Sequence, residues 1–305
     1  MRTFLSIIFA LVISAASAQI MPADSSIQVI GYWSKNDVQT YNVVNKKYKV
    51  KGEQDTVDVE TTKYQVDVKV LDSTATNYVI EWHYKNFDIS GSNQFTKSIS
   101  SIFKDMKVVI KTSDLGAFQE VVNWKEIRDE VKTAFVAIRQ KYKNLADVDQ
   151  VLKNVEEQMS SKAAIETYAI LDILQFYTFH GGKYTLHDDI ETNLVSNGIP
   201  GKPVDVLMTV QLSEINEGED NAVLRVWKEF DKTQMTDATY EVMKNLTKST
   251  KEKLPPRDEM PEISYSEYIG ARVHGGSGWI IYSVQTKQTS TGGSTTVEER
   301  EIEIL

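Results

Sequence analysis

Hydrophobic and polar residues alternate along most of the first half of the chain, and this alternation predicts β-strands. Valines and aromatic residues recur at every second position at Val57 and Val59, then from Tyr64 to Val70 and from Tyr78 to Tyr84, and Met106 to Ile110 repeats the pattern. A period of two places one face of each strand on a core and leaves the other in water, which is typical of an antiparallel sheet. We therefore expect neighbouring antiparallel strands here.

The period then changes to that of a helix. Apolar residues spaced by three or four positions predict a helix from Trp124 to Tyr142, with Asn123 as its N-cap and Glu126 completing a capping box. Three further helices are expected, at 149–159, 161–179 and 237–253. The helix at 161–179 is so rich in apolar and aromatic residues that we expect it to be packed on more than one side.

The last third of the chain returns to the strand pattern. Strands at 204–215 and 222–230 predict a hairpin, and strands at 263–273, 279–287 and 295–305 predict a three-stranded meander. Strands, then helices, then strands again indicate an α+β fold rather than a βαβ fold. We expect a curved antiparallel β-sheet, similar to half of a barrel, packed against a central helical block.

The start of the chain has a pattern of its own. A positive charge precedes an apolar run at 4–13, and small residues follow, with an Ala-x-Ala pattern formed by Ala16 and Ala18. This pattern indicates a secretory signal peptide at 1–18 that is cleaved to leave Gln19 as the first residue. The apolar run is shorter than the ~20 residues that a membrane-spanning helix needs. We therefore expect an exported protein, either periplasmic or extracellular.

Composition bounds the rest of the interpretation. Residues 19–305 are expected to form a single α+β domain, with a possible subdomain break at the Gly- and Pro-rich loop near 196–203. The chain has no cysteine, so its core must hold without disulfides. A formal net charge of −9 disfavours nucleic acids and anionic lipid surfaces as partners. The partners expected are an apolar small molecule or an envelope protein, with the oligomeric state left open.

Two groups of residues carry candidate chemistry. The segment 274–278, His-Gly-Gly-Ser-Gly, resembles the oxyanion loop of some esterases, but its glycines equally suit a tight hairpin, which we favour. His180, His187, Asp188 and Asp189 have the side chains of metal ligands, yet their spacing matches no zinc motif. We expect this cluster to be a polar connection between a helix and a strand, and we expect neither a metal nor a cofactor.

Several segments carry a resemblance to known proteins. They are the signal peptide, the strand 47–50 (Lys-Tyr-Lys-Val), the stretch 111–116 leading to the helix at Asn123, the loop 200–204 and the C-terminal meander. Together they make the chain similar to uncharacterised exported proteins of Gram-negative bacteria with domains of unknown function. A curved antiparallel sheet over helices is also the architecture of some periplasmic carriers of lipids and lipoproteins, a similarity of fold that implies little about function.

The abundant aromatic residues favour one function over two others. Fourteen tyrosines and five tryptophans, many on predicted strands, can line an apolar cavity in a curved sheet. The leading hypothesis is an exported, non-enzymatic protein that binds an apolar ligand or an envelope component in that concavity. One alternative is a periplasmic hydrolase that uses His274 or the His180/His187 cluster. The other is a structural or interaction module of the cell envelope, marked by an exposed strand edge or apolar patch.

Overall fold

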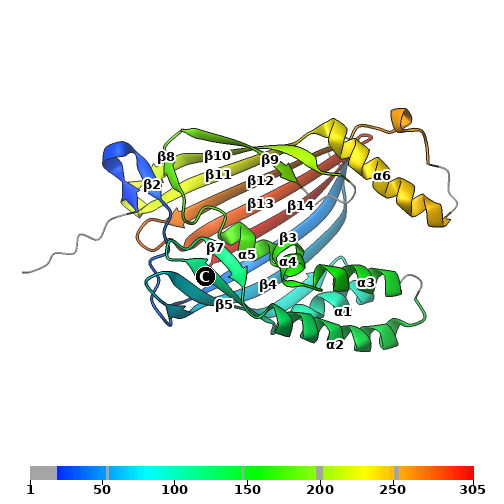
Figure 1. The fold of residues 1–305 in the computed structure, drawn as a ribbon, viewed down its shortest axis with the longest axis horizontal. Coiled ribbons are helices and arrows are strands. Elements are labelled where there is room, and N and C mark those ends of the chain that lie inside the picture. Colours follow the sequence, from blue (N-terminus) through cyan, green and yellow to red (C-terminus); the bar gives the residue numbers. More distant parts are fainter. Residues whose placement is uncertain (1–18, 53–54, 146–147, 197–201, 251–253) are drawn as a thin grey trace, which may run out of the picture.

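Eleven strands form one open, curved antiparallel sheet (Figure 1). The computed structural model describes residues 19–52, 55–145, 148–196, 202–250 and 254–305. In spatial order the strands are β7 (Phe118–Val121), β6 (Lys107–Ser113), β5 (Asn77–Ser90), β4 (Asp55–Ser73), β3 (Val38–Lys51), β14 (Ser294–Ile304), β13 (Ile280–Thr291), β12 (Ser264–His274), β11 (Asn221–Phe230), β10 (Val204–Asn216) and β9 (Asp189–Ser196). The predicted α+β class with a curved antiparallel sheet is confirmed, as are the hairpin β10–β11 and the meander β12–β13–β14.

Helices occupy the concavity of the sheet and its surroundings (Figure 1). They are α1 (Gln94–Ser100), α2 (Trp124–Tyr142), α3 (Val148–Gln158), α4 (Lys162–Ala164), a π-helical turn (Ile165–Ala169), α5 (Leu171–Phe176) and α6 (Lys232–Thr250). Helix α5 lies inside the concavity against β13 and β14, whereas α6 packs on β10 and β12. A small second sheet contains β1 (Ile20–Met21), β2 (Ser26–Gln28) and β8 (Lys183–Thr185).

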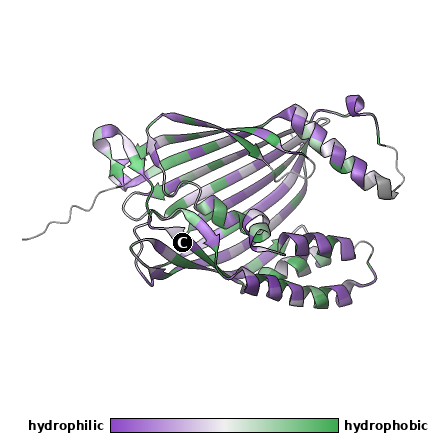
Figure 2. Ribbon diagram, in the orientation of Figure 1, coloured by the Kyte–Doolittle hydropathy of each residue, from purple (hydrophilic) through white to green (hydrophobic). Residues whose placement is uncertain are grey.

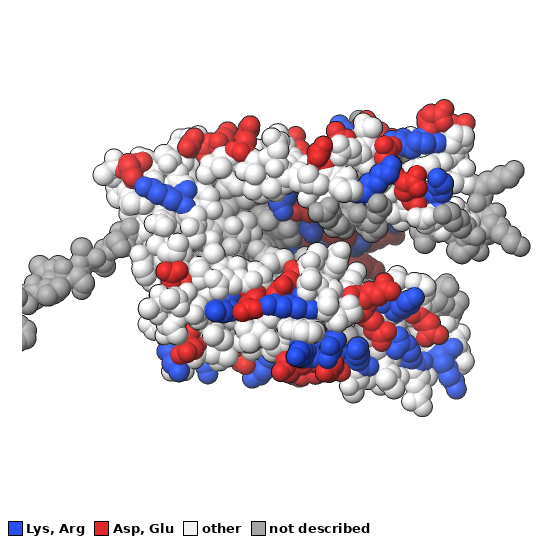
Figure 3. All heavy atoms as spheres, viewed as in Figure 1, with Lys and Arg blue, Asp and Glu red and all other residues white. Residues whose placement is uncertain are grey.

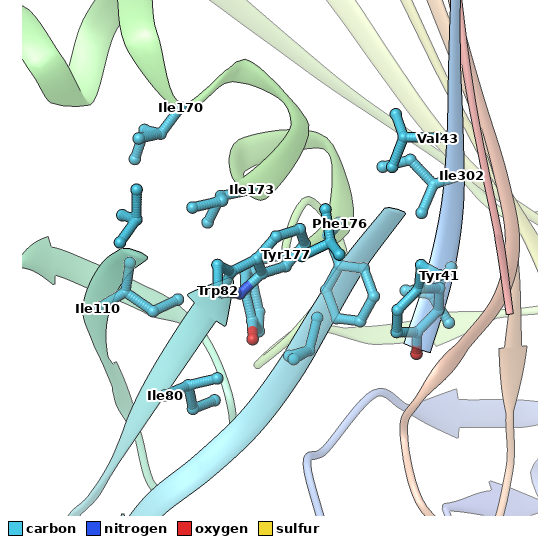
Figure 4. Close-up of a cluster of buried hydrophobic side chains, with 14 of the residues drawn as sticks. Tyr41, Val43, Ile80, Trp82, Ile110, Ile170, Ile173, Phe176, Tyr177 and Ile302 are labelled. Carbon is cyan, nitrogen blue, oxygen red and sulfur yellow. The ribbon is translucent and has the colours of Figure 1, made fainter. Parts of the chain in front are cut away.

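The core lies between α5 and one end of the concave face. Residues alternate along each strand between buried apolar and more polar positions, as Figure 2 shows by the change of colour along the ribbons. Phe176 of α5 packs edge-on against Tyr41 of β3 and Trp82 of β5, with ring centroids 5.2 Å apart in both pairs (Figure 4). Each of these large side chains removes apolar area from water, worth roughly 25 cal/mol per Å². This end of the concavity is therefore a solid core.

Two details of the predicted helices are wrong. The helix expected at 161–179 is interrupted: after α4 the chain makes the π-helical turn, and α5 begins only after Ile170, whose backbone lies outside the helical region at φ −110° and ψ 40°. Asn123 does not cap α2 with its side chain. Its amide instead accepts from the Val109 amide at 2.8 Å and donates to the Lys107 carbonyl at 2.9 Å, which fixes the start of α2 to β6.

Element boundaries differ elsewhere. Helix α6 begins at Lys232, five positions before the expected start at 237. Helix α1 and strands β8 and β9 were not predicted. The predicted signal peptide at 1–18, with Ala16 and Ala18, lies outside the described residues, and so does most of the loop near 196–203. Gln19 is described and is 2% exposed, and its side-chain oxygen accepts from the Ile30 amide at 3.3 Å.

Candidate functional site

The half of the concavity that the core does not fill contains three adjoining cavities. An inner cavity of about 270 Å³ lies between the sheet and the π-helical turn, and a floor cavity of about 260 Å³ adjoins it. A side cavity of about 700 Å³ lies between α5 and the strands β11–β13. Leu171 lines all three, so they surround the start of α5. Figure 3 shows the hollow between strands and helices, with charged atoms inside it.

A row of opposed charges crosses the outer part of the concave face, and we call it the charge ladder. Its members are Glu60 (β4), Lys47 (β3), Glu298 (β14), Lys287 (β13), Glu267 (β12) and Lys228 (β11), each directly opposite the next. Lys47 lies 2.6 Å from Glu298, while Lys228 and Lys287 lie 3.3 and 3.8 Å from Glu267. Opposite charges on facing strands stabilise a sheet, and here three acids and three lysines neutralise one another.

Polarity falls from the charge ladder toward the core. The next row inward contains Thr62, Asn45, Arg300, Gln285 and Ile269, and the row after it contains Tyr64, Val43, Ile302, Ser283 and Ala271. The concave face therefore changes from charged, to polar with one arginine, to mostly apolar over a few residues of each strand. A molecule lying along the strands would meet all three environments.

Glu267 is the most buried member of the charge ladder. Its side chain is 12% exposed, and its Oε1 accepts a hydrogen bond from the Tyr265 hydroxyl at 2.6 Å. Burial alone would raise the pKa of Glu267, but Lys228, Lys287 and Tyr265 outweigh it and hold the pKa below its usual value. This carboxylate stays ionised, which keeps the wall of the side cavity polar.

A buried carboxylate stands at the inner cavity. Asp172, in the first turn of α5, is 5% exposed and accepts the hydroxyls of Tyr64 at 2.8 Å and Tyr84 at 3.0 Å. It also accepts the Ile173 amide at 2.9 Å. Burial, followed by the charge of Asp172, raises the pKa of both tyrosines well above their usual value, so both hydroxyls remain donors. Three donors therefore satisfy this carboxylate.

Arg300 lies at the boundary between the inner and floor cavities and lines both. Its Nε donates to Asn45 Oδ1 at 2.9 Å, and its Nη1 donates to Gln285 Oε1 at 3.0 Å. Both acceptors are neutral amides. Among the described residues Arg300 forms no ion pair, and its Nη2 has no hydrogen-bond partner. The guanidinium is thus held in place without its charge being neutralised.

The π-helical turn forms the opposite wall of the inner cavity. Ile165 is fully buried there, Ala169 is half-buried, and Tyr168 is 44% exposed where the inner and side cavities meet. Single π turns occur often at functional sites because they widen a helix locally and redirect its side chains. In this chain the turn faces the cavity with apolar and aromatic groups, and Asp172 lies three positions after its last residue, Ala169.

The histidine of the predicted hairpin has hydroxyl and carboxylate neighbours. The turn 275–278 joins β12 to β13, so the hairpin prediction is confirmed. His274 Nδ1 lies 2.9 Å from Ser277 Oγ, and its Nε2 lies 3.7 Å from Asp220 Oδ2. The His274 and Asp220 side chains are 44% and 53% exposed, however, and among the described residues neither His274 nor Ser277 lines any of the three cavities. This contact lies in an exposed turn away from the concavity.

The structure separates the residues of the candidate metal cluster. His180 is 6% exposed, and its Nε2 lies 2.8 Å from the Gly278 carbonyl oxygen beneath the same hairpin turn. Burial lowers its pKa to about 4, so the ring is neutral near pH 7. His187, Asp188 and Asp189 are instead exposed around β8 and β9. Across the described ranges, no three or more His, Asp or Glu side chains are grouped so as to hold a metal ion.

One free edge of the sheet is apolar. β9 is an end strand, and its pairing with β10 places Ile190 and Leu194 on the concave face, where they are 40% and 39% exposed. Val195 points to the opposite face and is 58% exposed. The concave apolar surface thus continues to the edge of the sheet. In the described part of the chain no helix is long and apolar enough to span a membrane.

Comparison with known proteins identifies no family. No protein-family model matches the chain, and no curated protein matches it. Among solved structures, lipovitellin, studied for its lipid–protein interactions, aligns with 89% of this chain at 8% identity and a TM-score of 0.44; the chain spans 25% of lipovitellin. A putative exported protein with a YmcC-like fold from Bacteroides fragilis aligns over 88% of this chain and 97% of its own length, at 10% identity and a TM-score of 0.22.

Sequence reasoning missed the residues that give the concavity its polarity. Asp172 had a signal, since it is an isolated acid within the apolar stretch Leu171–Phe176. Arg300 had none, because it lies in a run of charged residues, between Glu298, Glu299 and Glu301. Its partner Asn45 lies 255 positions away along the chain.

Proposed function

We propose that this protein, after export, binds an amphipathic small molecule in the concavity of its sheet, and that it acts by binding rather than by catalysis. The observation that carries the proposal is the junction of an inner cavity with mainly apolar walls and a floor cavity with charged walls. Ligand sites are typically apolar pockets with a few placed polar groups, of about 300–1,000 Å³. The inner cavity of about 270 Å³ and the adjoining floor cavity of about 260 Å³ together fall in this range.

The apolar part of the ligand is assigned to the inner cavity. Its walls include Phe87, Phe103, Met106 and Met159, and methionine side chains adapt readily to an irregular ligand. The polar part is assigned to the row that contains Arg300. The signal pattern at 1–18 supports export, and the pairing of β9 with β10 supports the proposal that residues 19–305 act as a single domain.

Binding is preferred to hydrolysis for a geometric reason. Hydrolysis requires a nucleophile, a base and a substrate pocket in one place. His274 and Ser277 are in contact but lie in an exposed turn, whereas the cavities lie elsewhere on the molecule. Asp172, the acid beside the inner cavity, is held by three donors rather than placed against a nucleophile.

Native mass spectrometry of the mature protein, purified without detergent, tests the proposal. We expect a co-purifying mass of an amphipathic molecule that is released on denaturation. The substitution Ala169→Phe should reduce its occupancy by at least tenfold, because the added ring enters the inner cavity. Ala163→Phe is the matched control, since Ala163 is exposed in the preceding α4.

Equal loss of ligand in both variants would contradict the assignment of the inner cavity. If the protein carries no ligand, delipidated protein is titrated with dodecanoate and dodecan-1-ol below their micelle concentrations. Failure to bind either compound would refute the proposed function.

A further inference from the structure

We infer that Arg300 anchors an anionic head group, a carboxylate or a phosphate, of the amphipathic ligand. This inference rests on the proposed function and specifies the chemistry of the ligand's polar end. It depends on which charged side chains in the concavity already have a partner and which do not.

The charge ladder leaves no net charge on the outer floor. Its lysines and glutamates alternate, and Lys47, Lys228 and Lys287 each have a glutamate within 2.6–3.8 Å. A charged head group placed there would have to displace an existing partner. The ladder therefore provides a polar surface rather than a site for one sign of charge.

The acid at the inner cavity is also satisfied. Asp172 already accepts three hydrogen bonds, from two tyrosine hydroxyls and one backbone amide. A cationic head group would compete with these short, buried contacts. Asp172 is thus a poor site for a cation even though it carries a negative charge.

Arg300 lines both the inner and the floor cavity, and it differs from the charged groups described above. Among the residues that the structure describes, only neutral amide oxygens accept hydrogen bonds from Arg300, at Nε and Nη1, so the guanidinium is oriented while its charge is unneutralised. The outer edge of a guanidinium matches the two oxygens of a carboxylate or phosphate. Gln285, which holds Nη1, is itself only 8% exposed, so the arginine is supported from the buried side.

The position of Arg300 fits an anchor at the junction of head and tail. It lines both the inner cavity and the floor cavity, and the row behind it contains Val43 and Ile302. An anion on Nη2 would leave an attached alkyl chain directed into the inner cavity. The geometry therefore selects single-chain anions over neutral or cationic amphiphiles of the same length.

Calorimetric titration of the delipidated mature protein tests this inference with four probes below their micelle concentrations: dodecanoate, dodecyl phosphate, dodecan-1-ol and dodecyltrimethylammonium. A charge-assisted hydrogen bond should make at least one anion bind about 10–100-fold more tightly than the alcohol. The tighter of the two anions identifies the head group. The ammonium compound should bind no better than the alcohol.

Three arginine variants complete the experiment. Arg300→Gln should abolish the preference for the anion while leaving alcohol binding nearly unchanged, and Arg300→Lys should retain part of the preference. Arg272→Gln is the matched control, because Arg272 is exposed on the convex face of β12 and its removal should leave the preference intact.

The possible failures are distinguishable. Equal binding of alcohol and anion by the wild type, or an anion preference that survives Arg300→Gln, would overturn the inference but leave the proposed function standing. Absence of binding by all four probes would refute both.

Discussion

Replacing Asp172 with alanine should lower the free energy of unfolding by about 2–4 kcal/mol. The substitution removes the acceptor of two tyrosine hydroxyls, Tyr64 and Tyr84, each only 8% exposed, and of one backbone amide. Leaving a buried donor without a partner costs about 1–3 kcal/mol. The inner cavity adjoins both tyrosines and can admit water that would bond to their hydroxyls. The expected loss of stability is therefore smaller than the sum of the costs for three unpaired donors.

The reverse perturbation gives a sharper test of the same reasoning. Tyr64→Phe combined with Tyr84→Phe leaves a nearly buried carboxylate with one backbone donor, and should cost more than the two single substitutions added together. Adding Asp172→Leu to this pair removes the uncompensated charge and should restore stability toward the wild type. The three groups thus form a unit whose parts cannot be removed independently.

Urea unfolding followed by tryptophan fluorescence measures these changes, because Trp82 lies in the core beside α5. The midpoints convert to free energies if the slope with urea is the same in all variants. A loss below about 0.5 kcal/mol for Asp172→Ala, or strict additivity of the two tyrosine substitutions, would refute the view that this carboxylate is satisfied by buried partners.

Three further predictions concern titration and the hairpin turn. The pKa of His180 falls from 6.5 to about 4 on folding. The free energy of unfolding should therefore decrease by about 3 kcal/mol as the pH falls from 6.5 to 4. The urea midpoint of His180→Gln should depend less on pH between these two values. Glu267→Gln should lower the free energy of unfolding by about 1–3 kcal/mol at pH 7. Because folding lowers the pKa of Glu267, this difference from wild type should shrink as the pH falls below 4.5. An unchanged difference at pH 3.5 would contradict the pairing of Glu267 with Lys228 and Lys287. His274→Ala and Ser277→Ala should leave hydrolysis of a p-nitrophenyl ester at the wild-type level while lowering stability by about 0.5–1.5 kcal/mol, and a selective loss of hydrolysis in either variant would favour the hydrolase.

The sequence predicted the sheet because its alternation is long and regular. In each strand of the meander, apolar and polar residues alternate with a period of two, and no helical periodicity overlaps that pattern. The segment 161–179 was harder, because an apolar run has the same composition whether it forms one helix or two. The break at Ile170 depends on the fit of α5 to the sheet and of the π turn to the cavity, which are tertiary contacts.

The sequence predicted that a concavity exists but not which residues line it. Aromatic strand residues indicated a concavity, yet Tyr41 and Trp82 fill the core while Tyr64 and Tyr84 line the inner cavity. The four share the same period, and only the position of α5 separates them. The charge ladder was equally hidden, since its pairs become visible only when the register of the facing strands is known, and Lys47 and Glu298 lie 251 positions apart along the chain.

The central pair of strands, β3 and β14, joins the first and the last strand of the large sheet in chain order. Tyr41 lies opposite Ile304 and Lys51 opposite Ser294, so the middle of the sheet closes only when the last strand arrives. Until then β3 and β13 each present an unpaired edge, and exposed edges of this kind favour aggregation. Without β14 the sheet is two incomplete halves, one ending at β3 and the other at β13. A truncation that removes β14 would divide the sheet at its centre rather than trim its margin.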